Sequence, residues 1–155
     1  MSSTHHGVLL HVVFSTKYRK PFLDAKWRPE LYAVIGGIVK EHKAALLNAG
    51  GIEDHVHLLL KIHPSSAIAD TVKLAKANSS RWINEQRMLT LRFEWQRGYG
   101  AFSVSQSMRQ RVGEYIRNQE QHHRKQSFKE EYFTLLRNHQ VDFDERYVFD
   151  DEITG

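Results

Sequence analysis

Two histidines separated by one residue open a strand-like segment of the chain. The segment reads EDHVHLLLKI over residues 53–62, with His55 and His57 near its start. Alternate side chains of a strand point to opposite faces of a sheet, so both imidazoles lie on one face, about 6–7 Å apart at Cα. Two ring nitrogens at that spacing can converge on one ion, and neutral imidazole is the commonest metal ligand in proteins. The pair predicts part of a metal site, although a histidine–x–histidine strand without metal is the open alternative.

Tyr115 and Gln119 form a second candidate pair. They are four residues apart, so a helix places them on one face. A tyrosine hydroxyl can form a covalent intermediate, but its ordinary pKa near 10 means that it needs activation. Gln119 offers a neutral oxygen that could complete a three-ligand site with His55 and His57. The alternative is that Tyr115 is a packed aromatic of an amphipathic helix.

Gly113 lies two residues before the tyrosine within the same predicted helix. Glycine inside a helix costs about 1 kcal/mol relative to alanine. We therefore expect a close packing contact at this position. His11, on the first predicted strand, could line the site or belong to the framework of the sheet.

The composition limits the class of protein. The chain has 155 residues and no cysteine, which excludes a disulfide scaffold, cysteine-based zinc sites and cysteine nucleophiles. The N-terminus does not read as a signal peptide, and no segment approaches the length of a membrane span. We expect a cytoplasmic protein with one domain over 1–155, made of a core at about 8–139 and an acidic tail at 140–155.

The charge is mildly basic and unevenly distributed. Lys and Arg number 22 against 18 Asp and Glu, which gives a net charge of +4 and a pI near 9.4. Basic residues cluster over 17–20, 73–81 and 109–125, whereas 142–152 is acidic. This asymmetry suits a partner with phosphates, and a solvated surface is the alternative.

The periodicity of the chain predicts the elements that must position the candidate residues. Strand-like stretches cover 7–15, 51–62 and 97–105, and a short extra strand around 45–48 is left open. The first helical pattern begins near Lys26 to Glu30 and ends at Gly50-Gly51. Three further helical patterns cover 68–86, 105–125 and 127–139. Ser127 and Glu130 have the spacing of a capping box for the last helix.

This order of elements predicts a ferredoxin-like, RNA-recognition-motif-like α+β fold. The βαββαβ order gives an antiparallel sheet with helices on one face, followed by a C-terminal helix that carries Tyr115. The other face of the sheet, with both histidines, is expected to be free for a substrate or partner. The face against the helices is expected to be apolar and carries Val56, Leu58, Leu60 and Ile62.

Two motifs resemble those of a known family. His55-Val56-His57 resembles the histidine–hydrophobe–histidine motif, and residues 115–119 (YIRNQ) resemble the tyrosine helix, of the single-tyrosine transposases of the insertion-sequence 200/605 family. Further stretches similar to the family follow in the expected order at 11–23, 78–84, 95–107 and 115–132. Ala77-Asn78 departs from the pattern, because a lysine–glycine pair is common there.

The resemblance implies a mechanism and partners. Tyr115 would attack a phosphodiester of single-stranded DNA, form a 5′-phosphotyrosine link and release a 3′-hydroxyl. His55, His57 and Gln119 would hold a divalent ion, Mg²⁺ or Mn²⁺. The implied partners are single-stranded DNA with hairpin ends and a second copy of the chain, in a homodimer whose active sites are shared between subunits.

Basic and aromatic residues outside these motifs are candidates for DNA binding. Lysine and arginine would contact phosphates, and aromatic rings would stack on bases. The candidates are Lys17, Tyr18, Arg19, Lys20, Lys73, Lys76, Arg81, Trp82, Arg97 and Tyr99.

Three rival interpretations remain open. RGYGAF at 97–102 partly matches a signature of RNA-recognition motifs, which would make the chain a non-catalytic module for single-stranded nucleic acid. That match fails at Ala101 and leaves the histidines and Tyr115 unexplained. A metal-dependent hydrolase would use water as the nucleophile in place of Tyr115. A domesticated relative would bind or nick DNA hairpins without moving an element.

Overall fold

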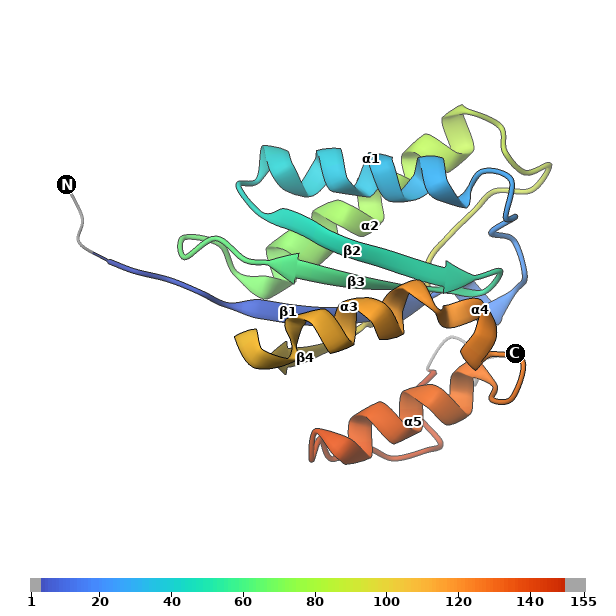
Figure 1. Cartoon of the computed structure of the whole chain (residues 1–155). Coiled ribbons are helices and arrows are strands. Elements are labelled where there is room, and N and C mark those ends of the chain that lie inside the picture. The colour runs from blue at the N-terminus through green and yellow to red at the C-terminus, as the bar shows by residue number, and fades with distance from the viewer. Residues whose placement is uncertain (1–3, 150–155) are drawn as a thin grey trace.

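The computed structural model of the chain describes residues 4–149, and a four-stranded antiparallel sheet lies at its centre (Figure 1). The strands follow the order β2-β3-β1-β4, so β1 and β3 are the two central strands. The predicted α+β class with an antiparallel sheet is confirmed. The strands are β1 (Leu9–Ser15), β2 (Ala45–Ile52), β3 (His55–Lys61) and β4 (Gly100–Val104).

Two long helices, α1 (Arg28–Glu41) and α2 (Ile68–Glu85), cover one face of the sheet. Leu31, Ile35 and Val39 form the buried stripe of α1, at the spacing of a helix face. They pack in one core with the apolar residues predicted for β3, which are Val56, Leu58, Leu60 and Ile62. The alternation of the histidine strand is therefore confirmed on its apolar side.

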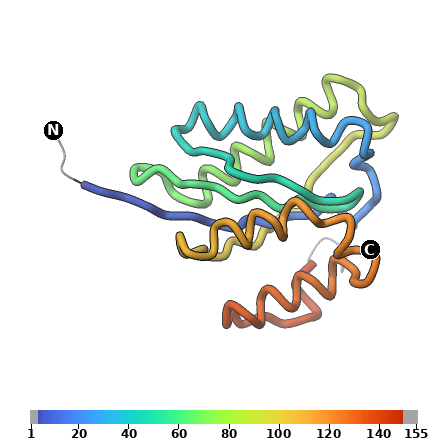
Figure 2. The backbone as a smooth tube through the Cα atoms, in the orientation of Figure 1, coloured from blue at the N-terminus to red at the C-terminus, as the bar shows by residue number. Residues whose placement is uncertain are grey.

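The opposite face of the sheet is covered rather than free. Three helices return over it, and they form the orange and red-orange part of the tube in Figure 2. They are α3 (Arg109–Arg117), α4 (Gln119–His122) and α5 (Phe128–Asn138). His55, His57 and Leu59 are all fully buried. The prediction of an open face was wrong, because α5 carries its own apolar stripe, which packs on Val13 and Phe102 of the sheet.

The first helix ends earlier than its glycines suggested. It stops at Glu41, and Lys43 takes a left-handed backbone conformation with φ of 63° before β2 begins. Gly50 and Gly51, the predicted helix end, lie inside β2. The short strand left open around 45–48 is the beginning of this longer strand.

Two short 3₁₀ helices, η1 (Lys17–Arg19) and η2 (Gln106–Met108), complete the elements. Part of the predicted acidic tail packs back on the fold, because Phe149 is buried beside α5. Residues 150–155 of that tail lie outside the described range. No helix within 4–149 combines the length and apolar character needed to cross a membrane.

Candidate active site

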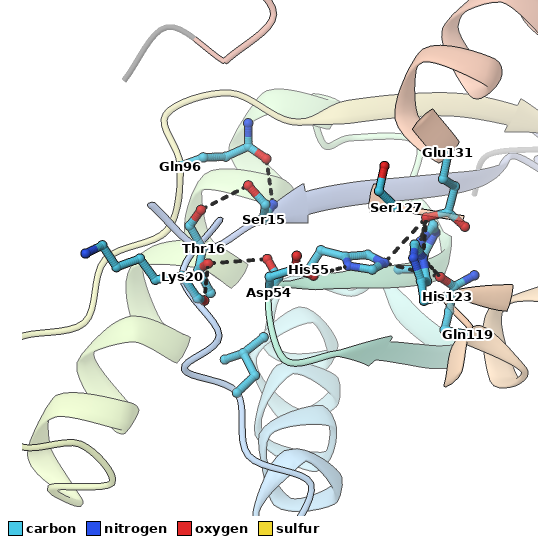
Figure 3. A network of polar contacts seen from close by, with 12 residues as sticks. Ser15, Thr16, Lys20, Asp54, His55, Gln96, Gln119, His123, Ser127 and Glu131 are labelled. Atoms are coloured by element: carbon cyan, nitrogen blue, oxygen red, sulfur yellow. Dashed lines mark hydrogen bonds and ion pairs between the residues drawn. The ribbon is translucent and has the colours of Figure 1, made fainter. Parts of the chain in front are cut away.

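The histidines enter the site at the start of β3, where the chain has just turned from β2. His55 pairs with Ser15, the last residue of β1, and with Ile52, the last residue of β2, at one end of the sheet. Its Nδ1 lies 2.7 Å from Oδ1 of Asp54, so Nε2 faces the helices (Figure 3). Burial lowers the pKa of His55, but hydrogen bonds to Asp54 and Glu131 outweigh it and raise the pKa above its ordinary value.

His57 is held by His11 of the neighbouring strand. Nδ1 of His57 lies 2.7 Å from Nε2 of His11, and the rings stack with centroids 5.0 Å apart. Burial lowers the pKa of His11 to about 3 and that of His57 to about 4, so both rings are neutral near pH 7. One proton lies between Nδ1 of His57 and Nε2 of His11. Either nitrogen can be the donor, so the hydrogen bond forms with either tautomer of His57.

The predicted helix over 105–125 is interrupted at Asn118. Helix α3 ends at Arg117, and α4 begins at Gln119. The side-chain amide of Gln119 donates from Nε2 to the carbonyl of Tyr115, 3.2 Å away. Because the amide nitrogen is used there, Oε1 of Gln119 faces the site, 3.2 Å from Nε2 of His55. The tyrosine and glutamine therefore lie beside the histidines of the same chain, on the two sides of a break in the helix.

Two glycines let α3 lie close against β2. A Cβ at Gly50 would be 1.9 Å from the carbonyl oxygen of Ile116, and a Cβ at Gly113 would be 2.7 Å from Nδ2 of Asn48. The guanidinium of Arg117 donates to Oδ1 of the same Asn48. The close contact predicted at Gly113 is confirmed, and it fixes the helix that carries Tyr115.

Glu131 reaches into the site from α5 and joins its parts (Figure 3). Oε1 lies 2.9 Å from Nε2 of His57, 3.0 Å from Nε2 of His123 and 3.4 Å from Nε2 of His55. Oε2 accepts a hydrogen bond from the hydroxyl of Tyr115. Burial alone would raise the pKa of Glu131, but the hydrogen bonds from the histidines outweigh it and hold the pKa far below that of an ordinary carboxyl.

The phenol of Tyr115 lies at the border between the buried site and solvent. Its ring is half-buried, with its centroid 5.8 Å from that of His57 and 4.6 Å from that of His122. Burial, and then the charge of Glu131, raise the pKa of Tyr115 above its ordinary value. In this arrangement the phenol is a hydrogen-bond donor, and an incoming positive charge would be needed to make it a better nucleophile.

The residues present fit a divalent metal ion. One donor atom each from His55, His57, His123 and Glu131 lies within 4.8 Å of all the others, and Oε1 of Gln119 adjoins them. The outward nitrogens of His55 and His57 are hydrogen-bonded to Asp54 and His11, as outer partners of metal-bound imidazoles usually are.

Sequence reasoning missed His123, Glu131 and Asp54. His123 follows Gln119 by four residues, which is the spacing of a shared helix face, and Asp54 precedes His55 directly. Those were the available signals. Glu131 has no comparable signal, because only the return of α5 over the sheet brings it to the histidines.

The candidate DNA-binding residues lie apart from this cluster. Lys73, Arg81 and Trp82 belong to α2, on the face of the sheet opposite to Tyr115. Lys76 donates to the backbone carbonyls of residues 96 and 98, and these two hydrogen bonds join α2 to the loop before β4. Residues 97–99 form the loop before β4, and Tyr99 packs partly against the α1–α2 core.

The basic turn after β1 lies closer to the histidine end of the sheet. The backbone of Thr16 donates to the carbonyl of Asp54, which places residues 17–20 beside the β2–β3 turn. Tyr18 is 45% exposed there, and Lys17 is paired with Glu94 at 3.1 Å. Arg19 lies over the ring of Phe149.

The fold and the site together define a class of protein. It is an α+β domain in which two histidines of a strand and a tyrosine of a helix surround one carboxylate, that of Glu131. The sequence profile of the family described as "Transposase IS200 like" matches residues 4–119. The chain belongs to this IS200-like transposase family, which confirms the resemblance of its motifs.

Curated relatives agree with this assignment. The chain is 26% identical over 125 residues to the transposase for insertion sequence element IS200 of Salmonella typhimurium, covering 77% of this chain and 81% of the relative. It is 28% identical over 114 residues to the ISDra2 transposase TnpA of Deinococcus radiodurans, covering 70% of this chain and 81% of that one.

Solved structures share the fold. The crystal structure of a protein assigned as a transposase from Deinococcus radiodurans matches with a TM-score of 0.63 and 27% identity, over 77% of this chain and 95% of that one. A REP-associated tyrosine transposase bound to a REP hairpin matches with a TM-score of 0.55, over 75% of this chain and 70% of that one. Its identity is 12%, so this second likeness concerns the fold alone.

Proposed function

We propose that the chain cleaves and rejoins single-stranded DNA at the ends of a mobile element through a covalent bond to Tyr115. The observation that carries the proposal is the convergence at Glu131. One carboxylate oxygen accepts from the phenol of Tyr115, and the other lies among the Nε2 atoms of three histidines. A nucleophile and a set of metal donors are therefore directed at the same point, as phosphoryl transfer requires.

A divalent ion is the cofactor that this donor set would take. His55, His57 and Gln119 would hold it, and His123 and Glu131 are further donors within reach. Imidazole-rich sites suit Mn²⁺ better than Mg²⁺, which prefers oxygen ligands, so Mn²⁺ is the ion for tests. When bound, the ion would polarise the scissile phosphate and offset its developing charge.

The chemical step is a transesterification. The oxygen of Tyr115 forms a bond to phosphorus as the bond from phosphorus to the 3′ oxygen breaks. The phenol gives up its proton and the departing 3′ oxygen gains one, so a 5′-phosphotyrosine and a 3′-hydroxyl result. One phosphodiester replaces another, and rejoining is the reverse reaction. Glu131 is placed to hold the phenol through its hydrogen bond and to aim the attacking oxygen.

The proposed substrate is a DNA strand with a hairpin, as in the complex of the REP-associated transposase. The surface beside Tyr115 has the charge for phosphate contacts. Exposed basic residues lie on α3 and in the loop after α4: Arg109, Arg111, Arg117, Arg124 and Lys125. The ten candidates from the sequence remain a prediction, and those at 17–20 adjoin the histidine end of the sheet.

A homodimer with shared active sites stays a prediction. Within one chain, Tyr115 already lies beside His57, so a single subunit can supply both groups. Mixing Tyr115→Phe protein with His57→Ala protein separates the two arrangements. Shared sites would recover activity in the mixture, because one intact site would form in each mixed dimer, whereas sites within single chains would recover none.

The test of the proposed function is a covalent adduct. The protein is incubated with Mn²⁺ and a single-stranded oligonucleotide that carries the hairpin from DNA flanking its own gene, and the products are separated on a denaturing gel. We expect a protein–DNA adduct with wild type and with the control Tyr147→Phe, whose tyrosine is exposed and is not one of the clustered site residues. We expect none with Tyr115→Phe, and strong loss with His57→Ala.

The rival functions give different results in the same assay. A hydrolase would cut the oligonucleotide without an adduct, and Tyr115→Phe would still cut. A binding module would give neither product, and its affinity would survive His57→Ala. The burial of Phe102 under α5, with its ring 4.6 Å from that of His139, argues against base stacking on this face of β4.

A further inference from the structure

A cavity of about 530 Å³ lies beside Tyr115, and its wall includes His11, the histidine that is hydrogen-bonded to His57. It lies between α3 and α5 over the end of β4, and we call it the α3–α5 pocket. Its size is within the range of sites for small organic groups. The apolar side chains that line it are Val104, Met108, Val112 and Leu135.

We propose that the α3–α5 pocket receives the base of one nucleotide next to the scissile phosphodiester. The inference rests on the proposed function, since it takes Tyr115 as the nucleophile. It adds a binding site for a nucleobase, and with it a means of choosing where the strand is cut.

The position of Tyr115 is the first argument. Its side chain forms part of the pocket wall, and its hydroxyl points to Glu131. A phosphate within reach of that hydroxyl carries a nucleotide on either side. The inner side of the hydroxyl is filled by Glu131 and by the fully buried His57, so a flanking base has no room there. The α3–α5 pocket is an adjoining space with an apolar wall that can take the base.

The chemistry of the wall is the second argument. The faces of a nucleobase stack on apolar and aromatic side chains with little regard to sequence. Met108 is 38% exposed, which leaves apolar surface available to a ligand. Ser103 and Ser105 also line the pocket, and polar atoms of these residues could bond the edge of a base.

Charge is the third argument, and it favours a nucleotide over an apolar peptide. Arg111 lines the pocket and is exposed on α3. Arg109 and Arg117 are exposed on the same helix. A guanidinium beside an apolar pocket matches a nucleotide, whose base is flat and whose phosphate is anionic.

The experiment combines a substitution that fills the pocket with an oligonucleotide that lacks one base. In a Tyr115→Phe background, which prevents the chemistry, binding of the hairpin oligonucleotide is measured by fluorescence anisotropy. Each nucleotide around the cleavage position is replaced in turn by an abasic residue. We expect one position where loss of the base weakens binding roughly tenfold. Leu135→Trp, which fills the pocket, should weaken the intact oligonucleotide by a similar factor and abolish the effect of that abasic residue.

Controls separate this result from unrelated damage. Leu91→Trp makes the same replacement at a residue that is 64% exposed and does not line the pocket, so it should leave the abasic profile unchanged. Met108→Trp fills the pocket from η2 and serves if Leu135→Trp does not fold. Size-exclusion chromatography of the free proteins shows whether filling the pocket changes the oligomeric state.

Two outcomes would overturn the inference. One is an abasic profile with no position that depends on the pocket, although the Tyr115→Phe protein binds the oligonucleotide. The other is a change of oligomeric state on filling the pocket, which would assign it to a second copy of the chain. A third result separates the two proposals. If one nucleotide position depends on the pocket but wild type forms no adduct, the proposed covalent chemistry is refuted and the base-binding site is supported.

Discussion

The hydroxyl of Tyr115, on α3, donates a hydrogen bond to the carboxylate of Glu131, on α5. The second oxygen of that carboxylate lies among the histidine nitrogens of the site. Glu131 thus ties the candidate nucleophile to the candidate metal donors, although the family profile ends at residue 119 and does not include it. Helix α5 thus supplies a residue of the candidate site, and its contribution can be tested apart from catalysis.

Replacing Glu131 should destabilise the metal-free protein. Glu131→Gln removes the charge that accepts hydrogen bonds from the buried histidines, so we expect a loss of about 1–3 kcal/mol in the free energy of unfolding. Glu130→Gln is the matched control, because Glu130 is exposed and bonds Ser127 and Thr134 through its backbone N–H and carbonyl. It should change stability by less than about 0.5 kcal/mol. Urea unfolding with a chelator present measures both, and equal effects would contradict the assigned role.

His11 should control metal affinity without touching the metal. With Nε2 of His57 bound to an ion, Nδ1 must carry the proton, and Nε2 of His11 is the acceptor 2.7 Å away. Loss of such an outer partner typically costs 10–100-fold in affinity. We expect His11→Phe to weaken Mn²⁺ binding by about that factor, as measured by calorimetry without DNA.

Two further variants sharpen that test. His11→Gln keeps an acceptor and should restore most of the affinity. His139→Gln changes a histidine that lines the α3–α5 pocket but stacks on Phe102 instead of bonding His57, and it should bind Mn²⁺ like wild type. If His11→Phe and His139→Gln bind equally well, His11 is only a framework residue.

Gly50 should tolerate no side chain, because α3 lies directly on it. A Cβ there would be 1.9 Å from the backbone oxygen of Ile116, so Gly50→Ala must push α3 away from β2. We expect a loss of about 1–3 kcal/mol, as for other overpacked sites, and a loss of adduct because Tyr115 moves with α3. Gly37→Ala is the control: nothing lies within 4 Å of its Cβ, and alanine should stabilise α1 by about 1 kcal/mol. Thermal unfolding of both variants checks the opposite signs.

Acid should destabilise the metal-free protein through its neutral histidines. Burial lowers the pKa of His11 to about 3 and of His57 to about 4, against 6.5 for the ordinary side chain. As the pH falls below about 6.5, these histidines become protonated in the unfolded chain but stay neutral in the folded protein. The free energy of unfolding therefore decreases as the pH falls to about 4. His55 opposes this trend, since its pKa is raised.

The measurement is the urea midpoint as a function of pH with a chelator present. His11→Phe removes one of the two neutral histidines and should make the dependence between about pH 6.5 and about pH 4 shallower. A wild-type midpoint that is flat or rises on acidification would show that these histidines are not held neutral.

Local rules were enough to predict the parts of the site that depend on periodicity. The strand period alone places His55 and His57 on one face, opposite the apolar residues of β3. The cap of α5 was equally local, and Ser127 accepts from the backbone of Glu130 as its spacing indicated.

The remaining features depend on tertiary contacts. The break at Asn118 is set by the bond from Gln119 to the carbonyl of Tyr115 and by packing on β2, and neither has a signature in the helix pattern. The end of α1 uses a left-handed lysine, Lys43, where glycine would have been the usual signal. Glu131 reaches its partners only because α5 folds back over the sheet.

The most direct test of the central claim is the identity of the residue that carries DNA. The adduct formed with Mn²⁺ is digested with nuclease and trypsin, and the peptides are examined by mass spectrometry. Cleavage after Arg111 and Arg117 gives VGEYIR, whose single tyrosine is Tyr115. We predict a 5′-linked nucleotide remnant on the tyrosine of this peptide. A remnant on any other peptide, or cleaved DNA with no modified peptide at all, would contradict it.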